Sequence, residues 1–130
     1  MLMSDAFDYV NVMDKGLDAS WLRMTTIANN LANVDTPNYK RTEVDFQDVL
    51  DRELRRTRFT DAHAAVKAVE LDDLEPTVYR DHANYSYRID RNNVDVDTEN
   101  VELASEQLRY QTISTATTSE LSKFSTAIGS

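Results

Sequence analysis

The acidic run at residues 95–106 is the part of the sequence that most resembles a metal site. Its carboxylates have the spacing of the first, third, fifth and twelfth positions of a calcium-binding EF-hand loop: Asp95, Asp97, Glu99 and Glu106. The sixth position is Asn100, whereas the sharp turn of such a loop requires glycine. We therefore expect no metal ion and interpret these acids as residues at a helix start, where carboxylates interact favourably with the helix dipole.

The other residues with catalytic potential are isolated. The two histidines, His63 and His82, have no partner at metal-ligand spacing, and we interpret both as surface residues. No serine lies in a nucleophile motif, and two glycines, Gly16 and Gly129, are too few for a phosphate-binding loop. A net charge of −9 disfavours binding to a phosphate backbone. We therefore expect no enzyme activity, no cofactor, no nucleic-acid partner and no small-molecule substrate.

The composition favours long helices. The chain has 130 residues, of which 41% are hydrophobic, and it contains two glycines, two prolines and no cysteine. So few helix breakers favour uninterrupted helices over a loop-rich β-fold. The first ten residues lack the basic and apolar regions of a cleaved secretory signal, so we expect any export to use another route.

Residues 1–34 carry a helical pattern. Apolar residues recur at alternating spacings of three and four, with Ser20 as the one break, and Trp21 widens the stripe. The stripe consists of Val10, Met13, Leu17, Met24, Ile27, Leu31 and Val34. A single helix of this span would be about 40 Å long, which exceeds what a globule of this size can cover. We therefore predict an N-terminal helix that forms one half of a coiled-coil-like pair.

The string NNLANVDTPNYKR, residues 29–41, predicts the end of that helix. Pro37 disfavours the helical region for Thr36. Asn38 is one of the few residues other than glycine that tolerate a positive φ. The string therefore predicts a helix stop followed by a sharp change of chain direction.

Residues 35–96 form a middle section with shorter elements. Asp45 is expected to cap a short amphipathic helix, and the arginine cluster at 55–58 is expected to be a salt-paired helix end. The pattern at 63–71 predicts a weak helix. Residues 77–80 and 85–89 alternate and are rich in β-prone side chains, which predicts two short strands in a small hairpin.

Residues 97–130 predict a second long helix with two apolar stripes. The first stripe consists of Val101, Ala104 and Leu108, and the second consists of Ile113, Leu121, Phe124 and Ile128. Serine and threonine, which compete for backbone hydrogen bonds, crowd the helix between residues 112 and 126. The predicted fold is therefore mainly α, with two long terminal helices in a coiled-coil-like pair and a loop-rich middle section that contains a short helix and a small β-hairpin.

Residues 28–41 resemble the N-terminal motif shared by the rod, hook and other axial proteins of the bacterial flagellum. Within that family, residues 43–46, 91–97, 102–104 and 107–111 resemble segments of the proximal rod proteins. The resemblance covers both ends of the chain, whereas residues 55–88 match in length and character alone. The family often has glycine at the position of Asn38, and the tolerance of asparagine for a left-handed backbone explains the difference.

The resemblance implies a structural subunit of the proximal rod in the flagellar basal body, which links the MS ring to the distal rod and transmits torque. It also implies export by the flagellar type III apparatus without a cleaved signal peptide. The implied partners are further copies of the chain, the rod proteins FlgC, FlgF and FlgG, the protein FliE and the MS-ring protein FliF. The alternatives are another rod subunit similar to FlgC, or a small helical secretion adaptor or chaperone.

The residue patterns indicate how such a subunit would assemble. We expect the N-terminal stripe to pair with the C-terminal stripes in a coiled coil that stacks on equivalent helices of neighbouring subunits. Three side chains are expected to hydrogen-bond the turn or a neighbouring subunit: Asn30, Asn33 and Thr36. Tyr39, Lys40 and Arg41 are expected to fix the direction of the outgoing chain.

Overall fold

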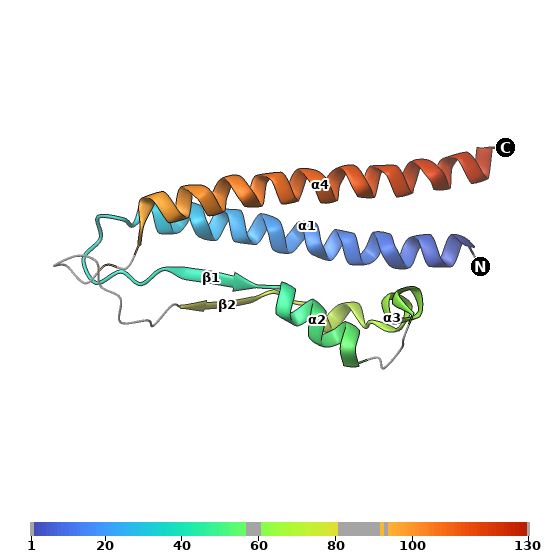
Figure 1. Ribbon diagram of the computed structural model, residues 1–130, viewed down its shortest axis with the longest axis horizontal. Coiled ribbons are helices and arrows are strands. Elements are labelled where there is room, and N and C mark those ends of the chain that lie inside the picture. Colours follow the sequence, from blue (N-terminus) through green and yellow to red (C-terminus); the bar gives the residue numbers. More distant parts are fainter. Residues whose placement is uncertain (1, 57–60, 81–91, 93, 130) are drawn as a thin grey trace.

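Two long helices dominate the computed structural model, which describes residues 2–56, 61–80, 92 and 94–129. They are α1 (Leu2–Ala32) and α4 (Val96–Gly129). The helices lie side by side and run in opposite directions, so that both chain ends lie at the same end of the molecule (Figure 1). The predicted mainly α fold with two long terminal helices is confirmed. None of the described helices combines the length and the apolar character needed to cross a membrane.

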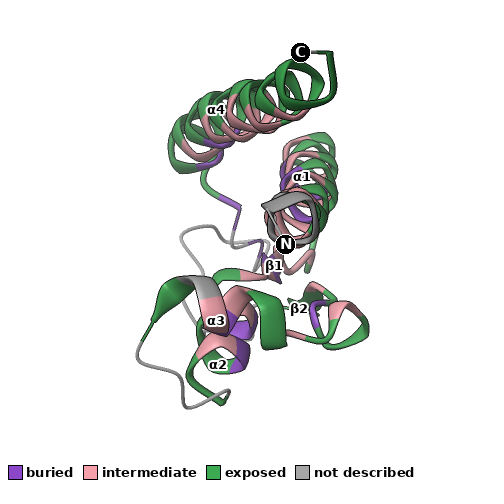
Figure 2. Ribbon diagram, turned by 90° about the vertical axis from the view of Figure 1, so that its right-hand side faces the viewer, coloured by how far each residue is buried: buried purple, intermediate pink, exposed green. Residues whose placement is uncertain are grey.

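The middle section lies along α1, on the side away from α4 in both views (Figures 1 and 2). In chain order it contains β1 (Thr42–Asp45), α2 (Gln47–Arg56), α3 (Ala62–Ala68), a short 3-10 helix (Leu71–Asp73) and β2 (Thr77–Arg80). The helix predicted at 63–71 is confirmed as α3, although the chain leaves the α-helical conformation after Ala68.

The two strands pair in an antiparallel sheet, with Thr42 opposite Arg80 and Asp45 opposite Thr77. The predicted strand at 77–80 is confirmed, and the predicted strand at 85–89 lies outside the described residues. The described partner of β2 is β1, which our sequence analysis does not predict. A pairing between strands so far apart in the chain leaves no local turn signal to detect.

Local sequence signals set the helix ends. A side-chain oxygen of Asp45 accepts a hydrogen bond from the backbone N–H of Asp48 (3.1 Å), which caps α2 as predicted. Asp95 caps α4 in the same way through the N–H of Asp97 (3.0 Å). Asn38 has φ = 60°, as its tolerance of the left-handed region predicts.

The arginine cluster at the end of α2 is salt-paired in its described part. Arg55 lies 2.7 Å from Asp51, one turn earlier in the helix. Arg56 lies 3.2 Å from both Glu53 and Asp73. The last of these contacts ties the end of α2 to the 3-10 helix.

The N-terminal stripe faces the interior of the molecule. Ile27 is buried, and the other stripe residues are half-buried: Val10, Met13, Leu17, Met24, Leu31 and Val34. Trp21 is 62% exposed, with its ring centroid 6.4 Å from that of Tyr110 on α4. Trp21 therefore lies at the edge of the seam between the helices and does not widen the packed stripe.

The helix α4 turns an unexpected face toward α1. Val101 is 70% exposed and Leu108 67% exposed, and Ala104 between them is exposed too. The expectation that this first stripe packs on α1 is therefore wrong. Figure 2 shows the exposed side of α4 turned away from α1. The buried side chains on the opposite side are carboxylates, Glu99 and Glu106, because they find hydrogen-bonding partners there.

The second predicted stripe of α4 is divided. Ile113 and Phe124 are half-buried, and the Phe124 ring lies 4.7 Å from that of Phe7 on α1. Leu121 and Ile128 remain 48% and 59% exposed. The apolar contact between the long helices is therefore narrow.

We expect replacement of Gly16 by alanine to stabilise the protein. A Cβ atom at this position would lie 3.7 Å from Cδ1 of Ile113, an ordinary packing distance. Alanine is favoured over glycine inside a helix, so the free energy of unfolding should rise by about 0.5–1 kcal/mol in urea denaturation. The control is Gly129→Ala at the last residue of α4, which should change little. A destabilised Gly16→Ala protein would contradict the described spacing of the helices.

Candidate functional site

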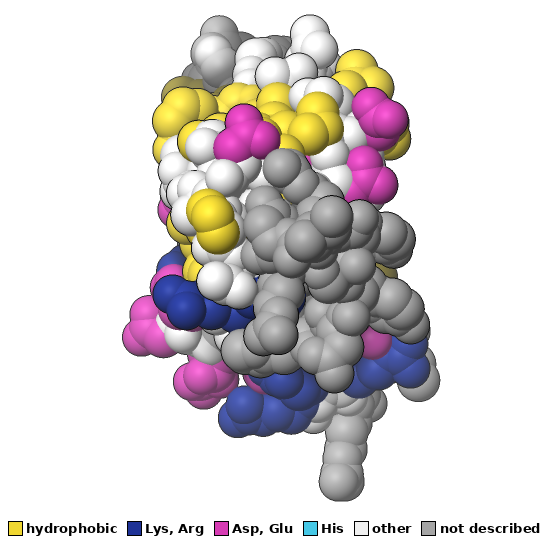
Figure 3. All heavy atoms as spheres, turned by 90° about the vertical axis from the view of Figure 1, so that its left-hand side faces the viewer, with side chains coloured by type: hydrophobic (Ala, Val, Ile, Leu, Met, Phe, Trp, Pro, Cys, Tyr) yellow, Lys and Arg dark blue, Asp and Glu magenta, His cyan; other side chains and the backbone are white. Residues whose placement is uncertain are grey.

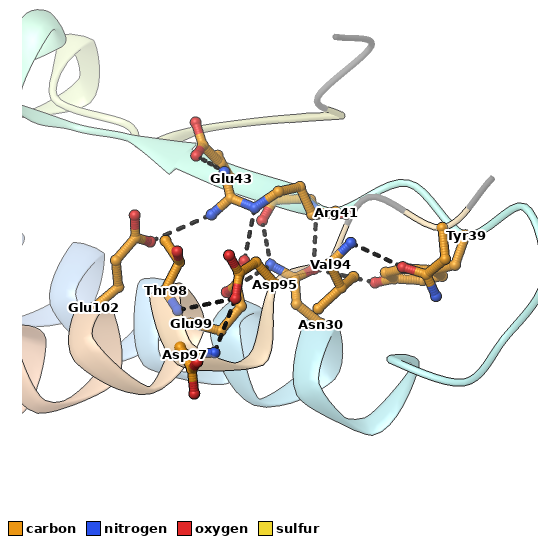
Figure 4. Close-up of polar contacts among 12 residues, drawn as sticks. Asn30, Tyr39, Arg41, Glu43, Val94, Asp95, Asp97, Thr98, Glu99 and Glu102 are labelled. Carbon is orange, nitrogen blue, oxygen red and sulfur yellow. Dashed lines mark hydrogen bonds and ion pairs between the residues drawn. The ribbon is translucent and has the colours of Figure 1, made fainter. Parts of the chain in front are cut away.

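A buried polar cluster joins the end of α1, the start of β1 and the start of α4 (Figure 4). After α1 the chain reverses through residues 33–38 and returns beside the helix, which brings Thr42 next to Asn30. The cluster, which we call the junction, consists of Asn30, Arg41, Glu43, Asn92 and Glu99. The end of α1 and the start of β1, which are close in the sequence, therefore meet the distant start of α4 at one point.

Asn30 is fully buried and provides partners for a strand edge. Its Nδ2 donates to the carbonyl of Thr42 (2.9 Å) and its Oδ1 accepts from the N–H of the same residue (2.9 Å). Oδ1 also accepts from the Tyr39 hydroxyl (3.2 Å), and Nδ2 lies 3.3 Å from Glu99. The side chain thus satisfies both backbone groups of Thr42, as a neighbouring strand would.

Arg41 provides the positive charge for the fully buried carboxylate of Glu99. Its Nε donates to Oε1 of Glu99 at 2.6 Å, and its other nitrogens pair with Glu43 and, at 3.3 Å, with Glu102. Burial alone would lower the pKa of Arg41, but the hydrogen bonds and negative charges of Glu99 and Glu43 outweigh burial and raise it. The guanidinium therefore stays charged. The sequence-based interpretation, in which Glu99 interacts with the helix dipole, is therefore incomplete, because the main partner of Glu99 is Arg41.

Asn92 closes the end of α1 from a distant part of the chain. Its Nδ2 lies 2.8–2.9 Å from the carbonyl oxygens of Asn33, Val34 and Thr36, and its Oδ1 accepts from the N–H of Val94 (2.8 Å). Carbonyls at a helix end and in the turn after it need partners from elsewhere. The sequence pattern does not predict this role, because an asparagine shortly before a helix is also common in ordinary turns.

The predicted turn residues hydrogen-bond within the turn. Nδ2 of Asn33 donates to the carbonyl of Asn29 (2.8 Å), and the Thr36 hydroxyl donates to Oδ1 of Asn33 (3.1 Å). Pro37 is exposed and Lys40 is half-buried. The turn is thus supported by its own side chains on one side and by Asn92 on the other.

A second buried cluster lies in the seam between the long helices. The Ser20 hydroxyl donates to Oε1 of Glu106 at 2.6 Å, and both residues are 3% exposed. Oε2 of Glu106 lies 3.6 Å from Arg23 and 3.5 Å from Arg109. The break in the apolar stripe at Ser20 is therefore a specific polar contact. Because buried polar groups require partners, this contact favours one register between α1 and α4.

An apolar trough of about 510 Å³ lies beside this seam, between α1, α4 and the segment that runs from β1 into α2. Its hydrophobic lining consists of Val12, Met13, Ala19, Ile27, Val44, Phe46, Leu50 and Ile113. Its polar lining includes Arg41, Glu43 and Glu106, which are paired within the chain. In the described part of the chain, no group of three or more His, Cys, Asp or Glu residues is placed to hold a metal ion. The arrangement fixes the relative positions of these segments and leaves an open concave surface between them.

Replacing Asn30 by alanine should strongly destabilise the fold. The change would remove the Asn30 amide from both backbone groups of Thr42 and take one donor from the buried Glu99, so we expect a loss of about 3 kcal/mol in the free energy of unfolding. Chemical denaturation followed by circular dichroism measures this loss. The control is Asn29→Ala at the exposed neighbouring position, which should shift the free energy by less than about 0.5 kcal/mol. Equal effects of the two changes would contradict the described role of Asn30.

The Tyr79 phenol should titrate at unusually high pH. Its hydrogen bond to Glu43, with a further contribution from burial, raises the pKa of Tyr79 from 10.0 to about 12. The neutral phenol is the favoured form, so its contribution to stability is complete below pH 10.0 and is lost as the pH rises to about 12. Ultraviolet difference absorbance of the chain against its Tyr79→Phe variant isolates this group.

In the same titration, Glu43→Gln should move the ionisation of Tyr79 to lower pH. Glu75→Gln is the matched control, because Glu75 is an exposed carboxylate that pairs with Lys15. A Tyr79 titration that is insensitive to Glu43→Gln would show that this hydrogen bond does not form in solution.

Comparison with known proteins assigns the chain to a family. A family model described as "Flagella basal body rod protein" matches residues 14–40, which span most of α1 and the turn. The chain is 35% identical over 109 residues to the flagellar basal body rod protein FlgB of Bacillus subtilis, with 78% of each chain covered. It is 31% identical over 117 residues to FlgB of Borreliella burgdorferi, with 83% of this chain and 86% of that protein covered. The chain therefore belongs to the FlgB family of flagellar basal body rod proteins.

Proposed function

We propose that the chain is a non-enzymatic structural subunit of the proximal rod, located in the basal body and exported by the flagellar type III apparatus. In this role it packs against further copies and against FlgC, FlgF, FlgG, FliE and the MS-ring protein FliF. It links the MS ring to the distal rod and transmits torque. The observation that carries the proposal is that α4 buries charged side chains, Glu99 and Glu106, and exposes apolar ones, Val101 and Leu108.

The face of α4 that points away from α1 carries no charge beyond Asp97. Residues three or four positions apart form this outer stripe, and all of them are exposed: Val101, Ala104, Leu108, Gln111, Thr115, Thr118, Ser122, Thr126 and Gly129. The buried carboxylates Glu99 and Glu106 lie on the opposite face. A surface helix of a monomeric protein normally has the reverse arrangement, with apolar residues inside and charges outside. The outer stripe therefore has the character of a surface that another chain covers.

Threonine hydroxyls on the outer stripe are satisfied within the helix. Those of Thr115, Thr118 and Thr126 donate to carbonyls one turn earlier, at 2.9, 3.0 and 3.0 Å. The methyl groups and helix backbone can then contact a neighbour without leaving a buried hydroxyl unpaired. Small side chains also allow two helices to approach closely. On the face near the turn, hydrophobic side chains lie in the upper part among uncharged and acidic ones, whereas Lys and Arg lie lower (Figure 3).

An uncharged stripe also suits assembly of an acidic chain. Copies that each carry a net charge of −9 repel one another, and contact through neutral surfaces keeps the like charges apart. The junction holds the turn, β1 and the start of α4 together, so a load on the helices reaches the middle section through Arg41 and Glu99. A rod grows as an open helical assembly, which requires repeated heterologous contacts between subunits.

Replacing Leu108 by aspartate should block assembly and leave the fold intact. Leu108 is 67% exposed in the subunit, so the charge becomes buried only when a neighbour covers the stripe. A loss of about 1 kcal/mol or more of contact energy weakens each interface severalfold. Because a buried charge costs at least this much, we expect rod incorporation to fall by about tenfold or more. Motility of cells that carry the variant and its amount in purified basal bodies measure the effect.

The matched control is Gln107→Asp, which adds the same charge at an exposed position of α4 outside the outer stripe. This variant should assemble and support motility. Normal rods and motility in the Leu108→Asp strain would refute the proposed use of the stripe. Circular dichroism of both purified variants confirms that the helices remain folded.

A further inference from the structure

We propose that the outer stripe of one copy docks into the trough of the next copy. The inference rests on the proposed function and specifies which faces meet. The docking part of the stripe is its apolar end, which we call the ridge and which consists of Val101, Ala104 and Leu108. The receiving surface is the trough between α1, α4 and the segment that runs from β1 into α2.

The trough matches an uncharged apolar occupant. Its hydrophobic lining comes from three walls, with Met13 and Ile27 on α1, Ile113 on α4 and Phe46 before α2. The buried charges at its base already have partners inside the subunit, as the Ser20–Glu106 hydrogen bond of 2.6 Å shows. Charged side chains such as Arg23, Asp48 and Arg109 also line the trough, so the match to an apolar occupant rests on the apolar part of its lining. The ridge brings no charge, and Val101 and Leu108 are the most exposed of the large hydrophobic side chains in the described residues.

The dimensions of the two surfaces agree. The trough is lined along α1 from Val12 to Ile27 and along α4 from Glu102 to Ile113. At the helical rise per residue, these walls are about 22 Å and about 16 Å long. The ridge, from Val101 to Leu108, extends for about 10 Å on the same measure. The trough can therefore receive the whole ridge and part of the helix on either side of it.

One subunit can use both surfaces at the same time. The residues of α4 that line the trough are Glu102, Glu106, Arg109 and Ile113, and none of them belongs to the ridge. When a surface patch fits a pocket elsewhere on the same molecule, the contact is heterologous and continues from copy to copy. A contact of ridge against ridge would instead close on itself as a two-fold dimer and stop. The geometry thus favours a second copy in the head-to-tail arrangement that an open assembly needs.

Cysteine cross-linking tests the pairing directly, because the chain contains no cysteine of its own. A Leu108→Cys chain is mixed with a longer, tagged chain that carries either Met13→Cys or Phe46→Cys in the trough. The full-length proteins are oxidised with copper phenanthroline over a range of concentrations. Docking holds the two thiols at a high effective concentration, so we expect about tenfold more mixed disulfide dimer than for a Gln107→Cys chain with the same partners.

Each outcome decides the proposal. A mixed dimer above the Gln107→Cys background supports docking of the ridge in the trough. Dimers of Leu108→Cys with itself at the expense of mixed dimers would overturn it in favour of a ridge-to-ridge contact. Equal yields for the Leu108→Cys and Gln107→Cys chains would overturn it as well.

The proposed function is tested separately by the Leu108→Asp strain. If that variant fails to assemble while no mixed dimer forms, the stripe is an assembly surface that meets a different part of its neighbour. If the variant assembles normally, the proposed function itself fails. The two results are therefore distinguishable.

Discussion

The buried ion pair between Arg41 and Glu99 is the contact on which the rest of the architecture depends. Glu99 has no exposed surface, so its carboxylate requires a positive charge and hydrogen-bond donors inside the fold. Arg41 supplies the charge from the start of the returning chain, and Asn30 supplies a donor from the last turn of α1. If one partner is lost, the others keep polar groups that water cannot reach. The contact therefore makes the end of α1, the start of β1 and the start of α4 one structural unit.

This constraint explains why α4 presents a neutral face to solvent. Glu99 and Glu106 lie two turns apart on one side of the helix, and both find their partners toward α1 and β1. Once they point inward, the apolar residues Val101 and Leu108 must point outward. The polar contacts thus fix the register between the helices and leave Val101 and Leu108 exposed.

Sequence patterns predict the elements of this fold well wherever the signal is local. Helical periodicity and the scarcity of breakers predict α1 and α4, and capping chemistry predicts the role of Asp45. The left-handed backbone at Asn38 follows from its residue type and its place after a proline. The strand β1 is not predicted, because its partner lies far along the chain and four residues carry little periodicity. Asn92 is missed for the same reason, since its acceptors lie in a turn nearly sixty residues earlier.

The sequence alone determined that two long helices flank a section of shorter elements and that the first helix ends before Pro37. It also identified two apolar stripes on the last helix, at positions 101–108 and 113–128. Only the tertiary structure decided that the first stripe faces outward and that Ile113 and Phe124 of the second face α1. Periodicity shows which residues share a face, but the direction of that face depends on the partners available to every residue of the helix. Here Glu99 and Glu106 point inward because Arg41 and Ser20 provide partners for their carboxylates. This arrangement is favoured although it leaves Val101 and Leu108 exposed, because an unpaired buried charge costs more free energy than an exposed apolar side chain.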